Sequence, residues 1–136
     1  MRYLLDTNVV SELRRKTPDA KVLAWFGSTD PSTLHISVLT LGEIVKGAEG
    51  LSRRDPVAGR ALLAWLDGLR QHYLDRLVGI DAAVAEEWGR LSAARTLPVI
   101  DGLLAATALV QGMTLVTRNA SDIAGTGVIV VNPWDA

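Results

Sequence analysis

The 136-residue chain carries 14 basic and 15 acidic side chains, for a formal net charge of −1, and it contains no cysteine. About half of its residues are hydrophobic, a globular composition that excludes a largely disordered chain. The absence of cysteine excludes disulfides and thiolate metal sites, and no apolar run approaches the roughly 18 residues of a membrane span. We expect a single cytoplasmic domain over residues 1–136, with no membrane partner.

Strands and helices alternate through the first half of the chain. Short apolar runs predict strands, and apolar residues at helical spacing predict helices. In chain order we expect a strand over residues 2–6, a short helix that begins at Ser11 and ends before Pro18, a helix over 19–26, a strand over 34–37 and a helix over 38–48.

The second half continues the alternation. Asp55 and Pro56 combine an N-cap carboxylate with a proline at the first helical position, so a helix should begin there. In order we expect this helix over 56–73, a strand over 77–80, a helix capped by Asp81, a buried helix over 100–110, and strands over 114–117 and 128–131.

Short apolar strands that alternate with helices predict an α/β domain with a parallel sheet of four to five strands flanked by helices. Trp25, Trp65 and Trp88 stand at amphipathic spacing and are expected in the core. Trp134 is expected to hold the end of the chain.

Four acidic residues fall where elements begin or end near one edge of such a sheet. Asp6 follows the first strand, Glu43 lies one to two turns into the helix after the second, Asp101 is in the first turn of the apolar helix, and Asp122 follows the fourth strand. Sites in open α/β sheets form outside the carboxyl ends of the strands. With only two histidines and no cysteine, any metal should be a hard cation such as Mg²⁺ or Mn²⁺ on oxygen ligands.

Such a cluster suits the hydrolysis of a phosphodiester. The attacking water must lose a proton, and the charge on the non-bridging and leaving oxygens must be stabilised. Divalent ions held by carboxylates do all three, and carboxylates that are crowded together need a cation because each raises the pKa of the others.

Each acidic residue also has a structural alternative. Asp6 could cap a helix, although Ser11 is better placed for that role. Glu43 follows Thr40 at the spacing of a capping box, Asp101 could simply complement a helix dipole, and Asp122 could belong to a turn.

Four segments together resemble the PIN-domain ribonucleases, and among them the VapC/FitB-like toxins of type II toxin–antitoxin pairs. These segments are Leu4-Leu5-Asp6-Thr7-Asn8-Val9-Val10-Ser11-Glu12-Leu13, Ile36-Ser37-Val38-Leu39-Thr40-Leu41-Gly42-Glu43-Ile44, Asp101-Gly102-Leu103-Leu104-Ala105-Ala106-Thr107-Ala108-Leu109 and Leu115-Val116-Thr117-Arg118-Asn119-Ala120-Ser121-Asp122. They span nearly the whole chain in the family's order. One departure is Ile123, where members of the family often carry phenylalanine.

The resemblance implies a PIN-like (Rossmann-like) fold and a set of residue roles. Asp6, Glu43, Asp101 and Asp122 would form the catalytic acidic cluster, with Asp6 and Asp101 foremost among the metal ligands. Thr7, Asn8, Thr117 and Asn119 would support it through hydrogen bonds. The implied reaction is endonucleolytic cleavage of RNA to 5′-phosphate and 3′-hydroxyl ends, and the basic residues available for RNA contact are Arg14, Arg15, Lys46, Arg53 and Arg118.

The resemblance also implies partners, namely a neutralising antitoxin and a second copy of the chain in a homodimer. Apolar residues of the helices at 19–26 and 56–73 are candidate partner surfaces. Two other hypotheses remain: a PIN-fold binding module without turnover, and a phosphohydrolase with Asp6 as nucleophile. The latter should carry a second aspartate two residues on, where this chain has Asn8.

Overall fold

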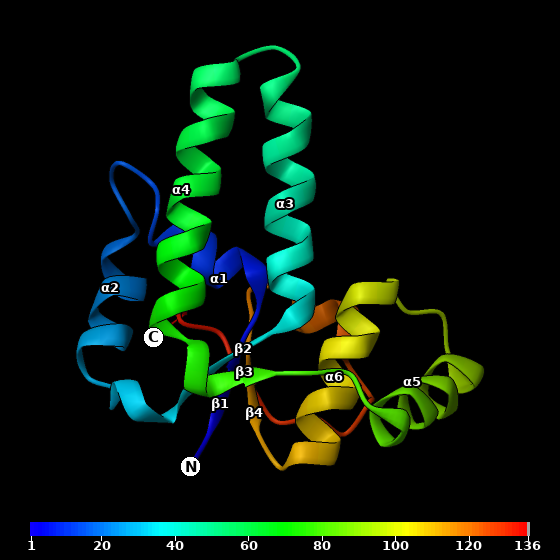
Figure 1. Ribbon diagram of the computed structural model, residues 1–136. Coiled ribbons are helices and arrows are strands. Elements are labelled where there is room, and N and C mark those ends of the chain that lie inside the picture. Colours follow the sequence, from blue (N-terminus) through cyan, green and yellow to red (C-terminus); the bar gives the residue numbers. More distant parts are fainter. Residues whose placement is uncertain (136) are drawn as a thin grey trace.

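The structure, a computed structural model, describes residues 1–135. Five parallel strands form one sheet in the order β3-β2-β1-β4-β5, and Figure 1 shows the helices arranged around it. The strands are β1 (Tyr3–Leu5), β2 (Leu34–Ser37), β3 (Leu77–Val78), β4 (Thr114–Val116) and β5 (Val130–Val131). The predicted α/β class with four to five parallel strands is confirmed.

Six α-helices and three short 3₁₀ helices connect these strands within the described residues. The α-helices are α1 (Thr7–Glu12), α2 (Ala20–Gly27), α3 (Val38–Ser52), α4 (Pro56–His72), α5 (Ala82–Ala94) and α6 (Val99–Gln111). The 3₁₀ helices are η1 (Pro31–Thr33), η2 (Leu74–Arg76) and η3 (Ala120–Ile123). None of the described helices is both long enough and apolar enough to cross a bilayer.

The sheet is buried on both faces, as parallel sheets require. Neighbouring strand residues point to opposite sides, so Leu4 belongs to a core with Leu104 of α6, whereas Leu5 belongs to a second core with Val10 of α1 and Tyr73 after α4. We call these the α6-side core and the α1-side core. Together they fix β1, the central strand, from both directions.

Three predicted helix starts are confirmed. Asp19, Asp55 and Asp81 are the N-caps of α2, α4 and α5, and each side chain accepts hydrogen bonds from the first turn. The end of α3 differs from the prediction: the helix continues to Ser52, because its last turns pack against α4 rather than ending in solvent. Figure 1 shows the two helices as an antiparallel pair that rises from the sheet.

The start predicted at Ser11 is wrong. Helix α1 begins directly after β1, and Asp6 is its N-cap; the helix ends at Glu12. The buried contacts of Val9 and Val10 with the α1-side core explain this earlier start. They draw the segment back onto the sheet immediately after the strand ends.

A glycine allows the α3–α4 pair to pack closely. A Cβ atom added at Gly59 would lie 1.8 Å from Ser52 Oγ and 2.9 Å from Ser52 Cα. Because the second of these atoms belongs to the backbone, a larger residue would force the helices apart. Glycine is therefore required at this position by close approach rather than by backbone conformation.

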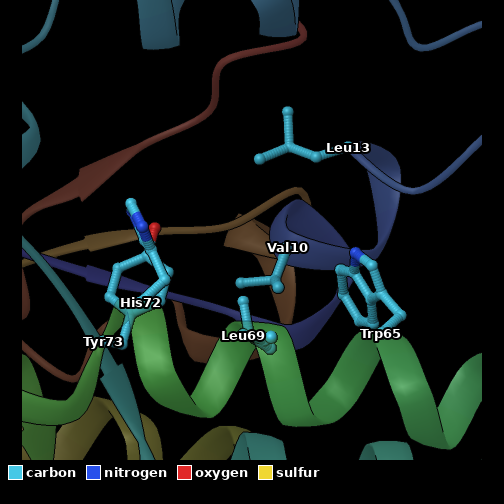
Figure 2. Close-up of a pocket in the computed structure, with 7 residues that line it drawn as sticks. Val10, Leu13, Trp65, Leu69, His72 and Tyr73 are labelled. Carbon is cyan, nitrogen blue, oxygen red and sulfur yellow. The ribbon is translucent and has the colours of Figure 1, made fainter.

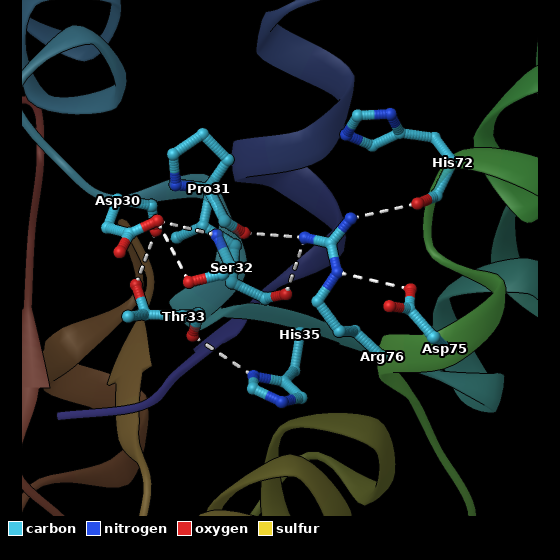
Figure 3. Close-up of polar contacts among 9 residues, drawn as sticks. Asp30, Pro31, Ser32, Thr33, His35, His72, Asp75 and Arg76 are labelled. Atoms are coloured by element: carbon cyan, nitrogen blue, oxygen red, sulfur yellow. Dashed lines mark hydrogen bonds and ion pairs between the residues drawn. The ribbon is translucent and has the colours of Figure 1, made fainter.

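Arg76 donates hydrogen bonds to backbone carbonyls from two separate parts of the chain (Figure 3). Its guanidinium donates to the carbonyl oxygens of Pro31 (2.6 Å), Leu34 (3.1 Å) and His72 (2.8 Å), and it stacks 4.7 Å from the ring centroid of Tyr73. The side chain is only 14% exposed. One cation thus joins the entry to β2 with the end of α4.

Arg76→Ala should lower the free energy of unfolding by about 2–4 kcal/mol, because three carbonyls lose a charged donor in a partly buried place. Urea denaturation measures the effect. The control is Arg70→Ala, which removes a solvent-exposed pair with Asp67 and should cost less than about 1 kcal/mol. Equal losses in the two variants would contradict the role assigned to Arg76.

Candidate active site

The predicted site residues follow the strands at the carboxyl edge of the sheet. Leu5 pairs with Ile36 on one side and with Val116 on the other. The residues that come next, Asp6 and Thr117, therefore lie together, and the Asp6 amide donates to the Val116 carbonyl at 2.9 Å. Strand register alone thus brings two positions that are 111 residues apart in sequence into contact.

Asp6 is buried, and each of its carboxylate oxygens has one donor. The Thr7 amide donates to Oδ1 at 2.7 Å, and the Thr117 hydroxyl donates to Oδ2 at 2.6 Å. Burial raises the pKa of Asp6, the two hydrogen bonds oppose that rise, and the charge of Glu43 adds to it. The residue therefore caps α1 and belongs to the acidic cluster at the same time, so the two roles are not alternatives.

Glu43 is linked to the same place through Thr7. Oγ1 of Thr7 lies 2.5 Å from Oε1 of Glu43 and 3.0 Å from Oγ1 of Thr40. The capping-box alternative fails because the N-cap of α3 is Ser37, whose hydroxyl accepts from the Leu39 amide. Glu43 therefore has no partner at the start of its own helix and faces α1 instead.

Asp101 shows that the four acidic side chains influence one another. Its pKa is raised from 3.8 to about 6, mainly by burial and then by the negative charges of Asp6, Asp122 and Glu43. Coulombic effects of this kind decay with distance, so all four carboxylates gather in one region. Asp101 occupies the first turn of α6 and its side chain is half-buried.

Asp122 is placed by a small chain of hydrogen bonds after β4. The Asn119 amide donates to Oγ1 of Thr117 at 3.0 Å, and the Asp122 amide donates to the Asn119 carbonyl at 3.0 Å. The turn chemistry expected for this segment is thus present, and it holds Asp122 in η3 near Asp101.

The donor set fits a hard divalent cation. It consists of carboxylate oxygens, and the buried Oδ1 of Asn8 in α1 finds no hydrogen-bond partner among residues 1–135. Within those same residues, no three His, Asp or Glu side chains stand at the spacing of a metal site.

The basic residues are distributed unevenly. Arg118 follows Thr117 directly, and Lys46 lines a hollow of about 300 Å³ together with Glu43. Arg14 lies over the Trp65 ring at 6.0 Å, while Arg15 pairs with Glu12 at 3.3 Å. Arg53 follows the last turn of α3, about 15 Å along the helix from Glu43 at 1.5 Å per residue.

Sequence reasoning missed the role of two polar side chains. Glu12 is only 5% exposed, and its carboxylate accepts from the Asp19 amide at 2.8 Å, which joins α1 to α2. The Thr40 hydroxyl is fully buried beside Thr7. Neither contact has a signal in local spacing, because both partners come from another element.

The PIN domain family matches residues 3–124, most of the chain, and the protein belongs to that family. The chain is 30% identical to the VapC ribonuclease Y4jK of Sinorhizobium fredii over 97% of each chain. Among solved structures, FitAcB from Neisseria gonorrhoeae superposes with a TM-score of 0.89 at 28% identity, over 98% of this chain and 99% of that one. A toxin-antitoxin complex from Klebsiella pneumoniae gives a TM-score of 0.68 at 25% identity, over 96% and 97% of the two chains.

The raised pKa of Asp101 predicts how stability depends on pH when no metal is bound. Since the folded protein holds the Asp101 proton up to about pH 6, the contribution of Asp101 to stability is most favourable below about pH 4 and falls as the pH rises through 6, because the unfolded chain ionises first. Near neutral pH in EDTA, Asp101→Asn should therefore stabilise the protein by about 1 kcal/mol after allowance for solvent screening.

Chemical denaturation across the pH range measures this difference. The matched control is Asp67→Asn, an exposed carboxylate that is outside the cluster. If Asp101→Asn is less stable than the wild type at neutral pH, or if its gain in the free energy of unfolding persists unchanged at pH 4, the four carboxylates do not repel one another.

Proposed function

We propose that the protein is a Mg²⁺- or Mn²⁺-dependent endoribonuclease and the toxin of a toxin–antitoxin pair. The observation that carries the proposal is the coupling of Asp101 to three other carboxylates at one sheet edge. The similarity to a VapC ribonuclease and to a toxin-antitoxin complex supports the substrate class and the biological setting.

Asp6 and Asp101 would hold the cation, with Glu43 and Asp122 as further oxygen donors. A bound ion would supply Lewis-acid stabilisation of the phosphate charge and would lower the pKa of the attacking water. The chain supplies orientation. The Thr7 amide and the Thr117 hydroxyl hold both oxygens of Asp6, and the Thr7 hydroxyl holds Glu43.

The positive charge of an ion would also lower the pKa of Asp101 and keep its carboxylate ionised below neutral pH, because it opposes the three negative charges that raise the pKa. The products expected from attack by water are 5′-phosphate and 3′-hydroxyl ends. A PIN-fold binding module without turnover would not cleave RNA.

Asp6→Asn should abolish RNA cleavage, with a loss of at least about a hundred-fold. The amide keeps an oxygen that can accept from the Thr7 backbone, so α1 remains capped, while the charge is lost. Asp55→Asn is the matched control, since it changes another N-cap at the distant end of α4. Cleavage of a labelled RNA in Mg²⁺ and calorimetric titration with Mn²⁺ provide the two measurements.

Wild-type cleavage by Asp6→Asn would refute the catalytic assignment. Failure of the unmutated, antitoxin-free protein to bind Mn²⁺ would favour the binding module instead.

An apolar groove beside the site is the proposed contact for the antitoxin. It encloses about 340 Å³ between α1 and α4 and is lined by Val10, Leu13, Trp65, Gly68, Leu69, His72 and Tyr73, which are drawn in Figure 2. Leu13 is 37% exposed. An apolar segment laid in this groove would lie close to Asp6, since α1 begins there. Homodimer formation stays a prediction.

Leu13→Glu should weaken binding of the cognate antitoxin by about ten-fold or more, because a charge would enter an apolar contact. Cleavage by the free protein should be unchanged. The control is Leu74→Glu, an exposed leucine of η2 outside the groove. Calorimetric titration of the two purified proteins gives the affinity, and equal affinity for the two variants would place the antitoxin elsewhere.

A further inference from the structure

Arg118 is a charged residue at the edge of the acidic cluster that pairs with none of its members. It follows Thr117, whose hydroxyl donates to Asp6, and it is exposed. Among residues 1–135 it takes part in no ion pair. Its guanidinium lies instead over the ring of Trp134, 4.8 Å from the centroid.

The end of the chain fixes that indole relative to the site. The Thr117 amide donates to the Val131 carbonyl at 3.0 Å, so the terminal segment leaves β5 next to the end of β4. Asn132 Oδ1 then accepts from the Trp134 amide at 3.0 Å. The Trp134 side chain packs on the α1-side core, which also contains Leu5 and Val116. The tryptophan therefore packs on the same core that contains the residues preceding Asp6 and Thr117.

A stacked guanidinium keeps its function as a donor. Stacking uses the planar face of the group, whereas the N–H bonds lie in its plane and point outward. These donors match the geometry of phosphate oxygens. An unsupported arginine would lose more conformational freedom on binding, and it could also turn onto the neighbouring carboxylates.

We propose that Trp134 is a positioning residue that holds Arg118 at the rim of the acidic cluster to bind a phosphate of the RNA strand. The inference rests on the proposed nuclease function and adds a residue that lies outside the four motif segments of the sequence. If Trp134 served only to hold the chain's end, its replacement would act on stability and would leave RNA affinity unchanged.

The test compares RNA affinity in Arg118→Ala, Trp134→Leu, Trp134→Phe and the double variant Arg118→Ala/Trp134→Leu. A short fluorescein-labelled single-stranded RNA is the probe, and fluorescence anisotropy with Ca²⁺ in place of Mg²⁺ gives the dissociation constant. Cleavage in Mg²⁺ gives KM and kcat in parallel, and thermal melting reports folding.

Arg118→Ala should raise the dissociation constant and KM about ten-fold, with little change in kcat. Trp134→Leu should raise them about two- to five-fold, the range of an exposed cation–π contact. Trp134→Phe should stay near the wild type. The double variant should be no worse than Arg118→Ala, because the tryptophan acts through the arginine.

Unchanged RNA affinity in Arg118→Ala, or fully additive losses in the double variant, would overturn the proposal. If Trp134→Leu fails to fold, Arg118→Lys decides, since lysine keeps the charge but cannot stack as a planar group. A partial loss of affinity supports the proposal, and full wild-type affinity refutes it.

The two proposals fail in different ways. If the unmutated protein cleaves RNA and the Arg118 and Trp134 variants bind RNA as tightly as it does, only the role of these two residues is refuted. The expected pattern of affinities without any cleavage would refute the nuclease function and leave the phosphate contact in place. No binding of RNA by the unmutated protein would refute both.

Discussion

The carboxylate of Asp6 holds the site together because it receives one hydrogen bond from each of two structural neighbours. The Thr7 amide attaches it to the start of α1, and the Thr117 hydroxyl attaches it to the end of β4. Both donors are rigid, since one is backbone and the other is fully enclosed. A carboxylate held at both oxygens keeps one orientation, which is what a metal ligand or a catalytic group needs.

The remaining acidic residues gather around this fixed point at an electrostatic cost. Burial and the other negative charges raise the pKa of Asp101, and burial raises that of Asp6 despite its hydrogen bonds. The fold tolerates the repulsion because Leu4 and Leu5 of the central strand are each buried in a core. Local strain at a functional site, offset by packing elsewhere, is a general pattern in enzymes.

Much of the fold and part of the site could be predicted from local sequence. The N-caps Asp19, Asp55 and Asp81 were predictable because an aspartate before an apolar periodic run is a preferred N-cap. The start of α1 was not, because packing of Val9 and Val10 against the sheet outweighs the capping preference of Ser11. Spacing also left Glu43 ambiguous, since its partner Thr7 lies 36 residues away.

The sequence by itself determined the alternation of strands and helices, the all-oxygen chemistry available to a metal, and the family to which the four motifs point. Only the tertiary structure decided that Asp6 both caps α1 and bonds to Thr117, that Glu43 faces Thr7, and that Arg118 rests on Trp134. The physical reason is that these contacts join residues from different elements. Strand register and core packing set their distances, and the spacing of residues within one element does not reveal which residue of another element will lie beside it.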